Sequence, residues 1–183
     1  MRKKKYLIFC LTTVALLIVI QLTAAAATKP LAGKKFVIDA GHGGWDPGAV
    51  GVNGLTEKQI NLRVAQYLRN CLTEYGGATV VMTRVDDRYH SLSSRVVKAN
   101  TSGADRFISI HHNGSVNPAH NGTAVYSGTN AGWQSRDLRN KVQQSLLKMT
   151  KLRDLGANSA NFYVLRHTKM PAILTEASFI TNP

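Results

Sequence analysis

The sequence contains few cysteines and few acidic residues. Of its 183 residues only Cys10 and Cys71 are cysteines, so a single thiol remains past residue 27 and an internal disulfide is excluded there. That part of the chain must depend on a hydrophobic core or a metal for stability, and we expect Cys71 to pack inside a helix. Ten acidic residues accompany 23 lysines and arginines, which gives a net charge of +13. The length favours one domain, and no internal repeat or low-complexity tract follows residue 27.

Long apolar runs are confined to the N-terminus. Basic residues at 2–5 precede an apolar stretch at 6–22, and small residues follow at 24–27. This order is typical of a secretory signal peptide. The alternative is an uncleaved membrane anchor, because the run approaches the length that spans a bilayer. We expect cleavage, since the small residues stand where a signal peptidase cuts, and both interpretations place the domain outside the cytoplasm.

The positive charge persists without this segment. Residues 1–27 carry four basic residues and no acidic ones, so their removal lowers the net charge from +13 to +9. A strongly basic surface attracts polyanions. Nucleic acid is not expected, because no helix-turn-helix, zinc-finger or aromatic-rich signature accompanies the charge. Export makes anionic polymers of the cell envelope the better candidates.

Strand and helix patterns alternate beyond a short linker at 28–34. Apolar runs predict strands at 36–38, 78–82, 107–110, 123–126, 162–165 and 172–175, and helical spacing occurs at 60–72, 92–99 and 138–149. Thr56 with Gln59 predicts a capping box at the start of the first helix, and Gly76-Gly77 predicts its end. We therefore predict a single α/β domain at 35–183, with a mostly parallel or mixed central sheet and helices on both faces.

Three polar residues stand where such a sheet binds ligands. Ligands lie beyond the carboxyl ends of the strands. His42 follows the first predicted strand, His111 ends the third and Glu176 ends the last. We expect the three side chains to converge on one rim of the sheet.

Each candidate has a structural alternative. His42 fits an ordinary turn residue, and His111 with its neighbour His112 fits a strand end whose side chains face opposite ways. Glu57 lies in the first helical turn, where a carboxylate favourably meets the helix dipole, and this interpretation is preferred from local physics. A purely structural role explains Glu176 less well, because a charge within an apolar run needs a partner. Histidine and glutamate are also the ligands of catalytic zinc, although their spacing here forms no local motif.

Several short blocks occur in a characteristic order: VIDAGHGG at 37–44, LTE at 55–57, MTR at 82–84, SR at 94–95, ISIHHN at 108–113 and PAILTE at 171–176. Through them the chain resembles, from residue 35 to 183, the zinc-dependent N-acetylmuramoyl-L-alanine amidases of the amidase-3 type. These are bacterial cell-wall hydrolases and sporulation or germination enzymes. The resemblance implies hydrolysis of the amide bond between N-acetylmuramic acid and L-alanine in peptidoglycan, during wall remodelling, cell separation, sporulation or germination.

The resemblance also implies site residues. It makes His42, Glu57 and His111 the Zn²⁺ ligands and Glu176 the catalytic general base. His112 is then a bystander or a substrate contact. We further infer that Asp39 orients one ligand, since zinc-bound imidazoles usually donate their other N–H to a carboxylate or carbonyl.

Other charged residues in or near these blocks have open roles. We expect Arg84 and Arg95 to hold loops by pairing with nearby aspartates (Asp86, Asp87 and Asp105), with binding of peptide carboxylates as the alternative. The basic residues before the last strand, Arg166, His167 and Lys169, are candidates for contacting glycan or peptide.

Peptidoglycan is thus the expected substrate. We expect the protein to act in the cell wall, outside the cell or in the periplasm, and to be a monomer. One alternative is a non-catalytic wall-binding domain, which the presence of all four site residues disfavours. Another is a zinc peptidase that cuts within the stem peptide, since the bond that is cut depends on the shape of the groove. The family usually continues into a C-terminal helix, so we expect a sequence that stops at Pro183 to be a fragment or a shortened variant.

Overall fold

The computed structural model describes residues 29–183, and the predicted signal segment at 1–27 lies outside them. Within the described part, no helix combines the length and apolarity needed to cross a bilayer. Residues 31–183 form one compact unit.

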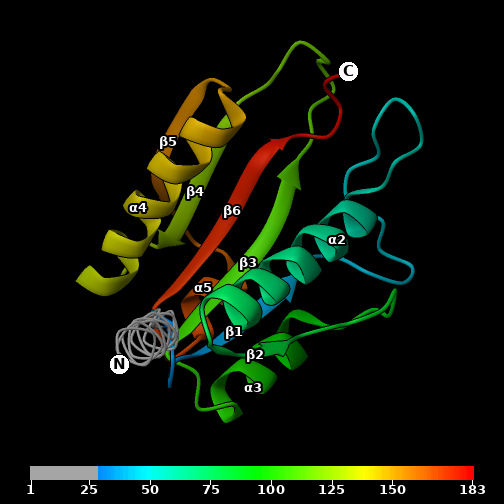
Figure 1. Ribbon diagram of the computed structural model, residues 1–183. Helices are drawn as coiled ribbons and strands as arrows, with labels where there is room; N and C mark the ends of the chain where they lie inside the picture. Colours follow the sequence, from blue (N-terminus) through cyan, green and yellow to red (C-terminus); the bar gives the residue numbers. More distant parts are fainter. Residues whose placement is uncertain (1–28) are drawn as a thin grey trace, which may run out of the picture. The chain divides into compact units, whose positions relative to one another are not determined.

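One mixed sheet of six strands organises this unit, in the order β2-β1-β3-β6-β4-β5 (Figure 1). The strands are β1 (Lys35–Ala40), β2 (Thr79–Met82), β3 (Arg106–Asn113), β4 (Thr123–Gly128), β5 (Asp154–Ala160) and β6 (Ala172–Phe179). β2, β1, β3 and β6 pair in parallel, β4 pairs in parallel with β5, and β4 runs antiparallel to β6. The predicted α/β class with a mixed central sheet is confirmed.

Helices cover both faces of the sheet. They are α2 (Glu57–Asn70), the π-helical turn η1 (Cys71–Tyr75), α3 (Leu92–Thr101), α4 (Trp133–Thr150) and α5 (Tyr163–His167). In Figure 1, α2 and α4 lie in front of the sheet. Residues of α3 and α5 pack instead against Val37, Phe107 and Leu174 on the opposite face.

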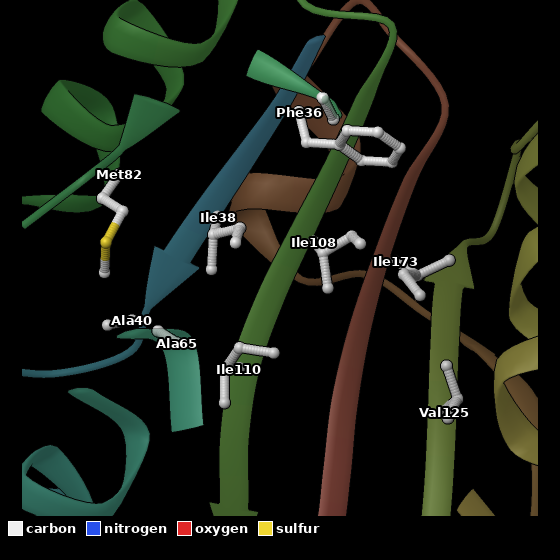
Figure 2. Packing of buried hydrophobic residues seen from close by; sticks show 10 residues of the cluster. Phe36, Ile38, Ala40, Ala65, Met82, Ile108, Ile110, Val125 and Ile173 are labelled. Carbon is white, nitrogen blue, oxygen red and sulfur yellow. The ribbon is translucent and has the colours of Figure 1, made fainter. Parts of the chain in front are cut away.

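The core beneath α2 and α4 is a row of branched side chains across neighbouring strands. Figure 2 shows Ile38, Ile108, Ile173 and Val125, one each from β1, β3, β6 and β4. Ile38 and Ile108 are register partners, as are Ile108 and Ile173. Fully burying such a side chain contributes roughly 1.5–3 kcal/mol, so this row fixes the register of the strands that carry the polar candidates.

α2 begins where its sequence predicts. The Thr56 N–H donates to Gln59 Oε1 at 3.1 Å, and the Thr56 hydroxyl donates to the same oxygen at 2.9 Å. The helix gives way to η1 before Gly76-Gly77, where Gly77 has φ of +75°. Cys71 lies exposed in this last turn, so the expectation that it packs inside a helix is wrong.

The segment between α4 and β6 differs from prediction. Residues 162–165 were expected to form a strand, but α5 occupies this segment, with Val164 and Leu165 buried against the sheet. β5 was not predicted. It is an edge strand bound to α4, where Gln143 Nε2 donates to Asp154 Oδ1 at 2.6 Å. Met149 in α4 is 82% exposed and does not belong to the buried helix face.

Candidate metal centre and active site

Four segments of the chain bring the predicted polar residues together at one end of the sheet. His111 in β3 and Glu176 in β6 are register partners in parallel strands, so their side chains lie on the same face. His42 follows β1 by two residues and has φ of +61°, a left-handed conformation that a non-glycine residue seldom adopts. Glu57 is the first residue of α2. The expected convergence on one rim is therefore present.

Two imidazoles and one carboxylate form a tight cluster. Ligand atoms of His42, Glu57 and His111 all lie within 4.8 Å of one another. His42 Nε2 is 3.0 Å from Glu57 Oε2, and His111 Nδ1 is 2.9 Å from Glu57 Oε1. Four ligands at zinc-bond lengths of about 2.1 Å in a tetrahedron stand about 3.4 Å apart. The cluster can therefore hold a small divalent metal with little movement.

Backbone and side-chain donors fix the Glu57 carboxylate. Oε2 accepts the Ala49 N–H at 3.0 Å, while Oε1 accepts the His112 N–H and Asn61 Nδ2, each at 3.1 Å. Burial opposes ionisation, but hydrogen bonds from His111 and His42 outweigh it and hold the pKa of Glu57 well below its usual range. Glu57 is therefore held as an anion in a fixed position. A carboxylate that only meets the helix dipole at the surface would not need these contacts.

Asp46 orients the first histidine. His42 Nδ1 lies 2.8 Å from Asp46 Oδ2, which leaves Nε2 directed at Glu57. A carboxylate bound to one imidazole nitrogen fixes the tautomer and raises the basicity of the other. This role was inferred for Asp39 from the sequence, and that inference is wrong.

Asp39 instead belongs to a buried network under the site. It accepts the hydroxyls of Thr83 and Ser109, each at 2.7 Å, and Arg95 Nη1 at 2.8 Å. Burial works against the charge, but Arg95 and these hydrogen bonds lower the pKa of Asp39 below its ordinary value.

Both buried arginines support the loops from below. Arg84 donates to the carbonyl oxygens of Ala40 and Gly41, each at 2.9 Å. Arg95 donates to the carbonyls of Ala40 and His42, each at 2.7 Å. Their predicted structural role is confirmed, although their partners are chiefly backbone carbonyls and Asp39 rather than the aspartates expected from the sequence.

Glycines allow the cluster to close. A Cβ on Gly41 would lie 2.2 Å from Cε1 of His111. Gly48 has φ of +65°, and a Cβ there would lie 2.5 Å from Oε2 of Glu57. Glycine at these two positions therefore lets the loop backbone approach the ligand side chains.

His112 faces away from the cluster and is buried against α2. Its Nδ1 lies 2.8 Å from Asn61 Oδ1. Because the amide nitrogen of Asn61 donates to Glu57, its oxygen accepts from His112. Burial lowers the pKa of His112 to about 4, which keeps the imidazole neutral. Of the two expected roles, the structure excludes substrate contact.

Glu176 stands beside the cluster with an unused oxygen. Its Oε2 is buried and has no hydrogen-bond partner among the described residues. Burial, reinforced by the negative charge of Glu57, raises the pKa of Glu176 to about 8. A carboxyl group with a pKa near neutrality can both take and give a proton.

A cavity of about 450 Å³ gives access to these groups. His42, His111 and Glu176 line it together with Tyr89, Phe162 and Tyr163, three aromatic residues that sequence reasoning missed. The only signal for Phe162 and Tyr163 was their position in an apolar run, which was assigned to a strand. Their place at the start of α5 explains how a short helix comes to border the site.

The basic residues before β6 lie elsewhere. Arg166 and Lys169 line a separate cavity of about 460 Å³ at the start of β6, and His167 does not line the cavity of the cluster. These residues lie away from the cluster, because the segment that precedes a strand reaches the opposite end of the sheet. Their predicted contact with glycan or peptide stays a prediction.

Comparisons with known proteins agree with one another. A family model, Amidase_3, described as N-acetylmuramoyl-L-alanine amidase, matches residues 36–183. An uncharacterized protein of Bacillus subtilis, YqiI, is 43% identical over 158 residues, which are 86% of this chain and 76% of that protein. The N-acetylmuramoyl-L-alanine amidase LytC of the same organism is 39% identical over 168 residues, covering 87% of this chain but only 34% of LytC.

A solved structure shares the fold. The crystal structure of an N-acetylmuramoyl-L-alanine amidase from Clostridium difficile 630 superposes with a TM-score of 0.79 at 39% identity. The match covers 84% of this chain and 83% of the other. Its identity and coverage relate the two proteins in sequence as well as in fold.

Proposed function

Because the chain belongs to the Amidase_3 family of N-acetylmuramoyl-L-alanine amidases, we propose that it hydrolyses the amide bond between N-acetylmuramic acid and L-alanine of peptidoglycan with the help of Zn²⁺. One observation carries the proposal. His42, Glu57 and His111 bring their ligand atoms within 4.8 Å of one another. The two histidines line a cavity together with Glu176, whose buried Oε2 has no hydrogen-bond partner among the described residues.

The donor set fits zinc. His42, Glu57 and His111 would supply two imidazole nitrogens and one carboxylate, the ligand types of catalytic zinc sites, and leave a position for water or substrate. A bound Zn²⁺ supplies Lewis acidity, which polarises a carbonyl group and lowers the pKa of water. Asp46 holds the tautomer of His42 that presents Nε2, and the backbone N–H groups of Ala49 and His112 hold Glu57.

Glu176 moves the proton. Its free Oε2 accepts a proton from the attacking water as the new C–O bond forms at the lactyl carbonyl. The same oxygen then returns the proton to the nitrogen of L-alanine as the C–N bond breaks, so that a carboxylic acid and an amine are released. Burial keeps this carboxyl group in an environment where a proton is easily held between the two steps.

The substrate places the site of action outside the cytoplasm. Peptidoglycan lies beyond the membrane, and the predicted signal at residues 1–27 would direct the domain there. Mature protein recovered from the culture fluid or the wall should begin near residue 28. An intact N-terminus in the membrane fraction would favour the anchor instead.

Digestion of purified peptidoglycan tests the proposal. We expect the protein to release intact stem peptides that begin with L-alanine, to lose this activity with a chelator and to regain it with added Zn²⁺. Mass analysis of the soluble products identifies the bond. His42→Gln should abolish release, while His120→Gln, at an exposed histidine outside the cluster, should not. Cleavage within the peptide would favour a zinc peptidase, and wall binding without products would favour a non-catalytic domain.

A further inference from the structure

Two aromatic side chains form an exposed stack beside the active site. The ring centroids of Trp45 and Tyr89 are 4.4 Å apart and the rings are inclined by 34°. Trp45 is 76% exposed and Tyr89 is 40% exposed. Large aromatic rings gain most of their free energy from burial, so an ordered pair that stays in water has an open apolar surface for a ligand.

The stack adjoins the catalytic cavity. Tyr89 and Asp46 both line that cavity, and Trp45 directly precedes Asp46 in the chain. Asp46 is the carboxylate that orients His42. A molecule resting on Trp45 and Tyr89 therefore lies next to the cavity that His42 and His111 line.

The turn that carries Trp45 is held rigidly. Gly43 and Asp46 exchange backbone hydrogen bonds of 3.0 and 3.2 Å across it. The Gly44 N–H donates to Asp87 Oδ1 at 3.0 Å, and Lys58 Nζ binds both the Gly44 carbonyl and Asp87 Oδ2 at 2.7 Å. Because the backbone of the turn is already ordered, binding a ligand here costs the protein little conformational entropy.

The charges around the stack favour a neutral ligand. Each nearby carboxylate is already paired, Asp46 with His42, Asp87 with Lys58 and Asp86 with Arg88. An ammonium group on the rings would find no free acid to accept its charge. A pyranose ring fits better, because it is uncharged and presents a face of C–H groups to the electron-rich face of an aromatic ring.

We infer that Trp45 and Tyr89 form a platform for a sugar ring of the glycan strand, so that the protein selects substrates by their glycan as well as by their amide bond. This inference rests on the proposed function for the identity of the substrate. It adds a specificity-determining contact outside the metal cluster.

A peptide-free glycan tests the platform independently of catalysis. The probe is the N-acetylglucosamine hexamer, titrated into the full mature protein and followed by isothermal calorimetry. We expect Trp45→Ala to weaken binding by about tenfold, the effect of losing about 1.4 kcal/mol of stacking. Trp45→Phe should restore most of the affinity. The matched control is Trp133→Ala, at a tryptophan that is 66% exposed at the start of α4, and it should bind as the wild type does.

Kinetics on peptidoglycan give a second readout. Trp45→Ala should raise KM for soluble glycan strands by a similar factor and change kcat much less, because the rings hold the substrate and do not touch the reacting bond. Equal behaviour of Trp45→Ala and Trp133→Ala would overturn the platform, even if peptide release proved the amidase activity. Absence of hexamer binding to the wild type would also overturn the platform. A Trp45→Ala variant that loses affinity for free stem peptide but not for the hexamer would overturn it as well. Loss of hexamer binding in a protein that releases no peptide would support the platform and refute the proposed function.

Discussion

Glu176→Gln is expected to remove most of the catalytic activity while the metal stays bound. Glutamine has nearly the same shape as glutamate but cannot move the proton. Loss of a general acid–base group typically costs about 10²- to 10⁴-fold in rate, so the release of stem peptides should fall by this factor while bound Zn²⁺ remains. A variant that keeps both its zinc and its activity would refute the assigned role.

The same substitution should stabilise the metal-free protein at alkaline pH. The folded-state pKa of Glu176, about 8, lies above the ordinary value of 4.5, so its ionisation destabilises the fold. This cost is absent below pH 4.5, grows between pH 4.5 and 8, and is constant above pH 8. A shift of this size corresponds to at most about 5 kcal/mol, at 1.36 kcal/mol for each pH unit.

Urea unfolding of chelator-treated protein at pH 4.5 and pH 9 measures the effect. The free energy of unfolding of Glu176→Gln should exceed that of the wild type by several kcal/mol at pH 9 and by little at pH 4.5. Glu74→Gln, at an exposed glutamate of η1, is the matched control and should track the wild type at both values. The same difference at both pH values would show that the carboxyl group is not destabilised by its surroundings.

Three further predictions concern the support of the site. Asp46→Asn should weaken zinc affinity by about 10- to 100-fold in a competition assay with a fluorescent chelator, because the imidazole loses its orienting carboxylate, whereas Asp137→Asn on the surface of α4 should not. Arg95→Ala should lower the free energy of unfolding by about 3–5 kcal/mol at pH 7, because it leaves Asp39 charged and buried. This loss of stability should shrink in acid. The stability that a carboxylate of depressed pKa contributes is present above pH 4 and disappears as the pH falls through the folded-state pKa. A loss that does not depend on pH would contradict the ion pair. Gly41→Ala should reduce both zinc content and activity, because its Cβ would overlap a ligand imidazole, and full zinc content in this variant would contradict the described approach.

The elements that the sequence predicted are those whose signal is local. Thr56 and Gln59 stand in a capping pattern, and the apolar run at 107–110 is the buried centre of β3. β5 has no such signal. Its sequence, DLGANSA, lacks alternating apolar residues. The strand lies at the edge of the sheet, and each of its residues is exposed or partly exposed. At 162–165 the β-forming composition was misleading, because packing of Val164 and Leu165 against the sheet favours the helix α5.

The site shows the same division. His111 and Glu176 were placed on one rim from the order of strands alone, since parallel strands bring their carboxyl ends together. The role of Asp46 was hidden, because Asp46-Pro47-Gly48 reads as a turn and only the folded loop brings its carboxylate to His42. Glu57 was the weakest candidate by local reasoning. Contacts with backbone donors outside its helix, at Ala49 and His112, which no local pattern encodes, distinguish it from a helix-capping residue.

Those contacts make Glu57 a cross-link between three segments of the chain. Its carboxylate joins the loop at Ala49, the start of α2 and the backbone of β3 at His112. Any excursion that exposes the Ala49 amide to solvent must therefore also dismantle the ligand cluster. Metal that binds only the intact cluster should slow hydrogen exchange at this amide increasingly as the free metal concentration rises above the Kd. The exchange rate of one backbone N–H then reports metal affinity without a chromophore and without substrate.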